Sequence, residues 1–153
     1  MRLSTAALTL FCAFTTAVPL ASKHNIYLAT CTRPRSCLLI ICDDPDPITA
    51  AAFYASGAST AARPTDITTI SDPAAAWEGV TRSGRLTTGK LTSAIDKGAK
   101  AVAKGEIAGS AKIGAEEYVC FKDGASKFTV QGWEDWSAQK LSCTADYWCA
   151  STS

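Results

Sequence analysis

Cysteine is the residue type whose spacing in this chain most clearly implies a chemistry. The sequence has 153 residues and seven cysteines, of which Cys12 lies in an apolar N-terminal stretch. The other six fall into an early and a late group: Cys31, Cys37, Cys42, Cys120, Cys143 and Cys149. In an oxidising compartment six thiols are expected to pair as three disulfides. Because each group has three members, an odd number of bridges must join the two groups.

Cys143 and Cys149 are not expected to pair with each other, because an extended strand would hold them too far apart in space. An extended chain from Cys143 to Cys149 would hold the two α-carbons ~20 Å apart, well beyond the ~7 Å limit for a disulfide. Cys120 can accept only one of them, so the other is expected to reach the early group and close a long loop. The rest of the connectivity stays open at this point.

Nucleophilic and metal chemistry find little support in the sequence. His24 is the only histidine, so a Ser-His-Asp or Cys-His site would have to use it. It stands close to the expected start of the mature chain, where residues are usually loosely held, and we interpret it as solvated. The Cys-x5-Cys and Cys-x4-Cys spacings do not match zinc ligand pairs. We therefore predict no metal, no cofactor and no catalytic residue.

Acidic residues offer two further chemistries. The segment Asp43–Asp46 could bind calcium, but it lacks the glycine and the terminal glutamate of a calcium loop, and a proline-containing turn is the simpler interpretation. The pairs Glu116–Glu117 and Glu134–Asp135 could serve glycoside hydrolysis. Adjacent acids on a strand point to opposite faces, however, so neither pair is itself a catalytic dyad. A small secreted hydrolase stays as the least favoured alternative.

Basic and aromatic residues mark the candidate binding surface. Lysines are expected along one face of a helix, two arginines flank a proline in a turn, and tryptophans gather late in the chain. Such lysines and arginines usually form a solvated face, and tryptophans in small disulfide-rich domains often cap the core. The candidate residues are Arg33, Arg35, Lys97, Lys100, Lys104, Trp133, Trp136 and Trp148.

The N-terminus has the features of a signal peptide. Arg2 precedes an apolar run over residues 6–17, and small residues precede a cleavage point before Val18. We predict a signal peptide over residues 1–17 and a single secreted domain over 18–153. Without Arg2 the domain has 14 basic and 14 acidic residues, so binding to nucleic acid is not expected. No later stretch has the ~20 apolar residues of a membrane-spanning helix, so stable membrane insertion is not expected either.

The first half of the domain combines apolar runs with turns. Residues 25–31 and 37–42 are expected to form a hairpin, and Leu38–Ile41, apolar on both faces, is predicted to be a central strand. Residues 48–55 fit a helix or a strand equally well. Residues 56–73 are rich in small polar residues and proline, which predicts a surface loop.

The second half is predicted to hold one helix followed by strands. Leu91, Ile95, Ala99 and Val102 recur on one face of a helix over residues 89–104. Four antiparallel strands are expected after it: 107–113, 117–122, 127–131 and 141–149. A hairpin around Asp123-Gly124 would set Phe121 opposite Phe128 and Val119 opposite Val130. The expected fold is therefore α+β, with an antiparallel sheet packed against one main helix and stapled by three disulfides.

Two segments carry a resemblance to known proteins. At Tyr118–Gly124 (YVCFKDG) and Ser142–Cys149 (SCTADYWC) the chain resembles small cysteine-rich secreted proteins of filamentous ascomycete fungi, which are classed as candidate effectors. The resemblance implies a secreted interaction protein that acts without catalysis on a protein or glycan of a host, a competing microbe or a cell wall. A carbohydrate-binding or antimicrobial, killer-toxin-like module is the alternative.

Overall fold

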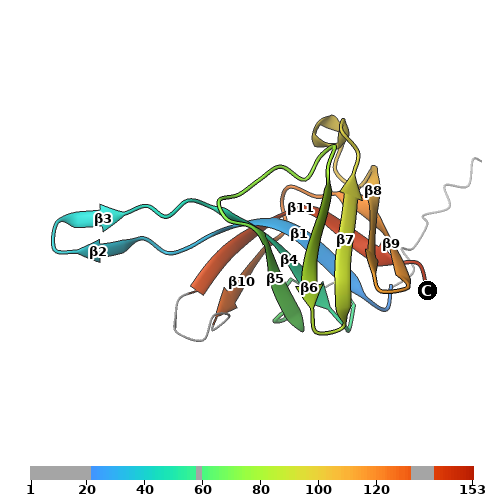
Figure 1. Ribbon diagram of the computed structural model, residues 1–153, viewed down its shortest axis with the longest axis horizontal. Coiled ribbons are helices and arrows are strands. Elements are labelled where there is room, and N and C mark those ends of the chain that lie inside the picture. Colours follow the sequence, from blue (N-terminus) through green and yellow to red (C-terminus); the bar gives the residue numbers. More distant parts are fainter. Residues whose placement is uncertain (1–21, 58–59, 132–139) are drawn as a thin grey trace, which may run out of the picture.

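The computed structural model describes residues 22–57, 60–131 and 140–153, and these form an almost entirely β structure (Figure 1). The predicted signal peptide lies outside the described residues. In chain order the elements are β1 (Asn25–Thr32), β2 (Ser36–Leu38), β3 (Ile41–Asp43), β4 (Ile48–Tyr54), β5 (Asp66–Ser71), β6 (Thr81–Leu86), β7 (Gly89–Ile95), the short 3-10 helix η1 (Ala99–Ala101), β8 (Ile107–Ile113), β9 (Glu116–Lys122), β10 (Lys127–Gln131) and β11 (Lys140–Ser151).

Nine of the described strands form one antiparallel sheet that curls into a nearly closed barrel. The hydrogen-bonded order is β5-β4-β1-β11-β9-β8-β7-β6, and β10 pairs with β11 beside this path. The two end strands, β5 and β6, meet through close packing: a Cβ at Gly84 would lie 2.6 Å from Ile70 Cδ1. Asp66 Oδ2 also accepts hydrogen bonds from the backbone N–H and hydroxyl of Thr87, at 2.6 and 2.7 Å. Glycine at position 84 thus lets the barrel edges approach.

The predicted helix over residues 89–104 is wrong, and the α+β fold class with it. Residues 89–95 are strand β7, in which Leu91, Ser93 and Ile95 are buried in alternation, and η1 follows as a single turn. The error has a simple cause: residues i and i+4 share a face in a helix and also in a strand. Leu91 and Ile95 are therefore buried as expected, but on a strand. Thr92, Ser93 and Gly89, which are poor helix formers, carried the contrary signal.

The predicted hairpin around Asp123-Gly124 is also wrong. β9 and β10 do not pair with each other; both pair with the long strand β11, β9 with Tyr147–Ser151 and β10 with Lys140–Thr144. The segment between β9 and β10 forms a turn. Asp123 Oδ1 accepts backbone hydrogen bonds from Ala125 and Ser126, at 3.1 and 3.0 Å, in an Asx-type turn. The four strands predicted after residue 105 do exist as β8 to β11.

Two apolar cores lie on opposite faces of the same strands. Ile26 and Leu28 of β1 point into the barrel, where they join a cluster from β4, β6 to β9 and β11. Tyr27 and Ala29 point to the other face and join a second cluster with Phe128 of β10. Tyr27 and Phe128 lie 5.9 Å apart between ring centroids. Strand alternation thus buries both faces of β1, and strand β4, which the sequence left ambiguous, is buried along its whole length.

Three disulfides connect the six described cysteines, and an odd number of them joins the early group to the late group, as predicted. Cys31–Cys143 joins β1 to β11 across 112 residues, and Cys120–Cys149 joins β9 to β11. Both bridges link directly paired residues of neighbouring strands. Cys37–Cys42 closes a local loop. One bridge therefore joins the two groups, and Cys143 and Cys149 take separate partners, as expected. Three disulfides are consistent with an extracellular protein.

Candidate functional site

A two-stranded arm leaves the barrel between β1 and β4. The arm comprises residues 33–47 and carries β2 and β3, which pair with each other and not with the nine-stranded sheet. Figure 1 shows it extending far from the barrel along the longest axis of the molecule. The Cys37–Cys42 disulfide links its two strands just before the turn. The arm is thus a covalently closed hairpin standing in solvent.

Four consecutive apolar residues form the tip of the arm. The exposed fractions are 80% for Leu38, 95% for Leu39, 96% for Ile40 and 72% for Ile41. By comparison, the other large apolar residues exposed in the described part of the chain are Val80 at 44% and Ile107 at 65%, both single positions on the barrel. Isolated exposed apolar residues are ordinary, whereas a contiguous apolar patch marks an interaction site.

The turn at the tip uses an unusual residue. Leu38 pairs with Ile41, so Leu39 and Ile40 form a two-residue connection, and Leu39 has φ = 57°. Two-residue hairpin turns need positive φ at this position and usually place Gly, Asn or Asp there. A leucine at such a position is strained. The chain therefore presents a large apolar side chain where a small or polar residue would fold more easily.

The prediction of a central strand over Leu38–Ile41 is accordingly wrong. Apolar residues on both faces suggested burial from two sides, but the segment folds back on itself within four residues. The sequence indicates this only if Cys37 is known to pair with Cys42, and the cysteine count left that pairing open. Five residue steps of extended chain would separate Cys37 and Cys42 by ~17 Å, so a disulfide between them requires a tight hairpin. The predicted pairing of residues 25–31 with 37–42 fails for the same reason.

Charged residues at the base of the arm are paired. Arg33 contacts Asp72 at 2.7 Å, which fastens the start of the arm to the loop after β5. Arg35 donates hydrogen bonds to both carboxylate oxygens of Asp44 across the arm. The two arginines of the predicted binding surface thus lie in the part of the arm nearer the barrel, each engaged with an aspartate. The surface loop predicted over residues 56–73 is wrong in part, because this segment contains strand β5. The strand ends at Ser71, directly before Asp72, the partner of Arg33.

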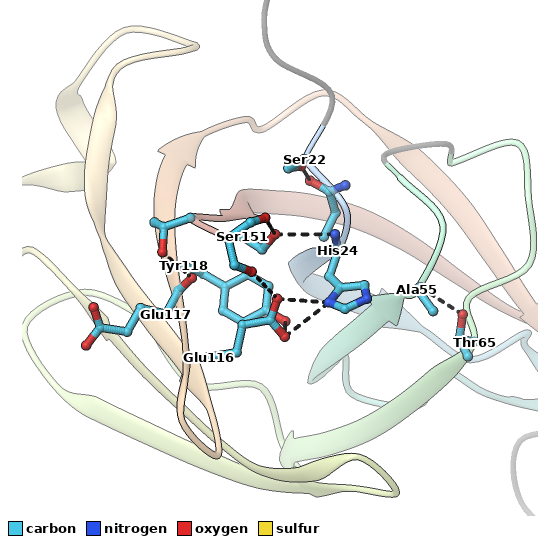
Figure 2. Close-up of polar contacts among 11 residues, drawn as sticks. Ser22, His24, Ala55, Thr65, Glu116, Glu117, Tyr118 and Ser151 are labelled. Atoms are coloured by element: carbon cyan, nitrogen blue, oxygen red, sulfur yellow. Dashed lines mark hydrogen bonds and ion pairs between the residues drawn. The ribbon is translucent and has the colours of Figure 1, made fainter.

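A polar cluster on the barrel centres on Glu116, at the start of β9 (Figure 2). His24 Nδ1 lies 2.8 Å from Glu116 Oε1, and the hydroxyl of Tyr118 donates to Oε2 at 2.8 Å. Ser153 Oγ donates to Oε1 at 3.2 Å. The expectation that His24 is loosely held is therefore wrong: its ring also packs against Phe53, with centroids 5.6 Å apart.

The electrostatics of this cluster suit a structural role. Burial alone would raise the pKa of Glu116, but the hydrogen bonds from Tyr118 and His24 together lower it below its ordinary value. Burial and the Glu116 carboxylate raise the pKa of Tyr118. A carboxylate that already accepts hydrogen bonds from three side chains has little capacity left to accept a proton from a substrate. The cluster joins β1 to β9.

A second polar cluster lies near η1. The hydroxyl of the buried Tyr147 donates to Glu78 Oε1, and Lys122 Nζ lies 4.6 Å from the centroid of the Tyr147 ring. Burial would raise the pKa of Glu78, but the Tyr147 hydrogen bond and the charges of Lys100 and Lys122 lower it. Beside it, burial raises the pKa of Asp146 despite a 2.7 Å hydrogen bond from Thr30.

The predicted lysine face does not form, because no helix carries it. Lys97, Lys100 and Lys104 are exposed around η1, and two of the three lie beside acidic residues. Lys104 Nζ is 3.4 Å from the buried Asp123, and Lys100 acts on Glu78. Within the described residues, no group of three or more His, Cys, Asp or Glu side chains could hold a metal ion.

Of the three tryptophans in the predicted binding surface, the structure describes only Trp148. Trp133 and Trp136 lie outside the described residues. Trp148 is half-buried on β11, and its ring stacks on Phe121 of β9 with centroids 4.9 Å apart and planes inclined by 24°. Trp148 also packs against the second apolar cluster, so it covers part of the core, and a binding role for it stays a prediction.

Comparisons with known proteins add no relative: no protein-family model matches the chain, no curated protein matches its sequence, and no solved structure matches its fold. Among the described residues, no helix is long and apolar enough to cross a membrane. The candidate functional site therefore rests on the chain's own geometry, and the apolar tip of the arm is its most distinctive feature.

Proposed function

We propose that this chain is a secreted, effector-like interaction protein that contacts a host or other extracellular target through the apolar tip of its arm, without catalysis. The observation that carries the proposal is the exposure of Leu38, Leu39, Ile40 and Ile41 on a disulfide-closed arm that stands away from the barrel. The N-terminal signal-peptide pattern and the disulfides support export. The resemblance to fungal cysteine-rich secreted proteins supports the effector class.

The tip is better explained by binding than by folding. A buried Leu or Ile side chain stabilises a protein by roughly 1.5–3 kcal/mol relative to an exposed one. Leu38 to Ile41 contribute almost none of this within the chain, because all four side chains are exposed. Residues that add little to the fold, and that include a strained Leu39, are free to serve contact with another surface.

The polar clusters support a non-catalytic function. Glu116 and Glu78 each accept a hydrogen bond from a buried tyrosine, and each is held by neighbouring basic groups. These contacts link strands of the barrel to one another. The tip, by contrast, presents no acid, base or nucleophile, so its chemistry is that of apolar contact.

The proposal can be tested with a double substitution at the tip. Labelled wild-type protein and a Leu39→Asp/Ile40→Asp variant would be compared for binding to plant and microbial cells, both walled and as protoplasts. The matched control is Val80→Asp/Ile107→Asp, which changes two exposed apolar residues of the barrel by the same charge. We expect the tip variant to lose binding and the control to keep it. Equal binding by all three proteins would disprove a role for the arm.

One observation favours the carbohydrate-binding alternative. The accessible part of the Trp148–Phe121 stack could hold a sugar ring, as aromatic side chains do in many glycan sites. A glycan array separates the two functions. Binding that falls with Trp148→Ala and is unchanged by Leu39→Asp/Ile40→Asp would establish the alternative.

A further inference from the structure

We infer that the surface contacted by the tip is the interface of a lipid bilayer, into which the arm inserts its four apolar side chains reversibly. This inference rests on the proposed function, because it names the partner of the same site. It concerns shallow insertion of a hairpin tip and not a membrane-spanning segment. Four observations on the tip carry it: exposure in all directions, size, charge and the conformation of Leu39.

The tip is exposed on every side. Leu38 and Ile41 are a cross-strand pair, whereas Leu39 and Ile40 form the turn beyond them, and every one of the four is at least 72% exposed. A protein groove would cover one face or one edge of such a ribbon and leave the other residues in water. The apolar region of a bilayer surrounds an inserted tip from all sides, so it can bury the whole set.

The tip is also small for a protein partner. A stable protein–protein interface buries roughly 800 Å² on each side and uses roughly 20–30 residues of each partner. The tip offers four apolar residues at the end of a narrow ribbon. A bilayer sets no such minimum. The four side chains carry about 16 carbon atoms, comparable to one myristoyl chain, which gives weak and reversible membrane binding.

Backbone and charge are compatible with shallow insertion. The Ser36↔Asp43, Cys37↔Cys42 and Leu38↔Ile41 pairs satisfy the backbone groups that face each other across the ribbon, while the outer edges stay open, so insertion has to stop at the depth where those edges still meet water or lipid headgroups. Arg35, the nearest basic residue, is bound to Asp44. In sequence the arm has two arginines, Arg33 and Arg35, against three aspartates over residues 43–46. Attraction to anionic lipid is therefore not the driving force, and binding should depend little on salt.

The conformation of Leu39 points the same way. Its φ of 57° is disfavoured for a leucine, and the residue is 95% exposed, so packing within the described part of the chain does little to compensate for the strain. An apolar side chain at the farthest point of the arm reaches deepest into any surface that the arm meets. Insertion into lipid would supply the apolar contacts that the free protein lacks.

The inference is tested by co-flotation with phosphatidylcholine vesicles. The proteins are the wild type, Leu39→Asp/Ile40→Asp, and the matched control Val80→Asp/Ile107→Asp, with thermal melts to show that all three are folded. We expect wild type and control to partition onto the vesicles, and the tip variant to partition at least about tenfold less. Raising the salt concentration or adding phosphatidylserine should not strengthen binding of the wild type.

The outcomes separate this inference from the proposed function. If the tip variant loses binding to cells but the wild type ignores vesicles, the arm has a protein or glycan partner and the bilayer is excluded. If the wild type binds only vesicles that contain phosphatidylserine, charge drives binding and apolar insertion is excluded. If neither cells nor vesicles distinguish the tip variant from the control, both the inference and the proposed function fail.

Discussion

The barrel and the arm use the same building unit with opposite results. Each contains antiparallel strands joined by a disulfide between directly paired cysteines. In the barrel, Cys31 and Cys143 are buried in the second apolar cluster, among the side chains of Ala29 and Phe128. In the arm, Cys37 and Cys42 are exposed, and the apolar residues beside them face solvent.

If the arm binds a target as we propose, this difference separates stability from binding. The barrel gains its free energy of unfolding from two apolar cores and from bridges that close long loops. The arm has one short ladder and one short loop, and its apolar side chains touch no core. Changes in the barrel should therefore act on unfolding, whereas changes at the tip should act on binding and leave unfolding unchanged. The predictions below test this division, beginning with the largest effect.

Ile95→Asp should abolish folding of the barrel. Ile95 is 3% exposed in the interior cluster, and an unpaired carboxylate there costs about 4 kcal/mol or more, a large part of the stability of a typical domain. Expression yield, circular dichroism and thermal melting measure the effect. Ile107→Asp, at a position 65% exposed, is the control and should change stability by less than about 0.5 kcal/mol. A well-folded Ile95→Asp protein would contradict the assignment of the interior.

Removal of the two kinds of disulfide should have very unequal effects. The Cys31–Cys143 bridge closes a loop of 112 residues, for which the chain-entropy model gives about 4–5 kcal/mol. The double variant Cys31→Ser/Cys143→Ser should lower the thermal midpoint by about 10–20 °C. The Cys37–Cys42 bridge closes a loop with a separation of only 5 residues and orders only the arm. In the double variant Cys37→Ser/Cys42→Ser, the thermal midpoint of the barrel should therefore not move. Equal shifts would show that the arm is part of the barrel's cooperative unit.

The sequence predicted the covalent frame better than the fold. Parity and strand geometry correctly required a bridge between the two cysteine groups and separate partners for Cys143 and Cys149, because these arguments depend on counting and distance alone. The helix over residues 89–104 failed because Leu91 and Ile95 are spaced by four, which does not distinguish period 2 from period 3.6. The pairing of β9 with the second half of β11 skips over β10, and no local sequence pattern specifies that one long strand pairs with both.

The functional features were harder to predict because they are departures from usual patterns. An apolar run such as Leu38–Ile41 is ordinarily buried, and the hairpin follows only once Cys37 and Cys42 are known to pair, which the cysteine count left open. His24 seemed free because it is close to the N-terminus, yet β1 pairs with β11 and β4, and its position beside Glu116 follows from that pairing. The turn predicted around Arg33 and Arg35 is wrong as well, because the chain runs on through both residues into β2 and turns only at Leu39 and Ile40.

Glu116→Gln should make a smaller and pH-dependent change in the barrel. The pKa of Glu116 is lowered in the folded state, so its carboxylate stabilises the protein above the ordinary glutamate pKa of about 4.5, and this stabilisation is lost as pH falls through the lower folded value. At pH 7 the variant should be about 1 kcal/mol less stable. The difference from wild type should shrink as the pH falls below 4.5 and through the lower folded value, so stability is compared at pH 7 and at about pH 3.

Chemical denaturation at the two pH values measures this difference. Glu117→Gln is the matched control, because Glu117 is the next residue on β9 and its side chain is 72% exposed. Its effect should be small at both pH values. Glu78 and Asp123 also have lowered pKa values, so the wild type should still lose stability in acid after Glu116 is replaced. A Glu116→Gln protein as stable as wild type at pH 7 would mean that the His24–Glu116–Tyr118 contacts do not hold β1 to β9.

Leu39→Gly should have the smallest effect on unfolding and still reduce binding, which makes it the sharpest test of the division between arm and barrel. Glycine adopts φ near 57° without strain, so the turn should become easier to form, by about 1 kcal/mol of local free energy. The barrel does not contact Leu39, and its thermal midpoint should stay unchanged. Vesicle or cell binding should nevertheless fall several-fold, because one of the four apolar side chains is lost. Equal or tighter binding by the glycine variant would show that the shape of the turn, and not the leucine side chain, is what the target recognises.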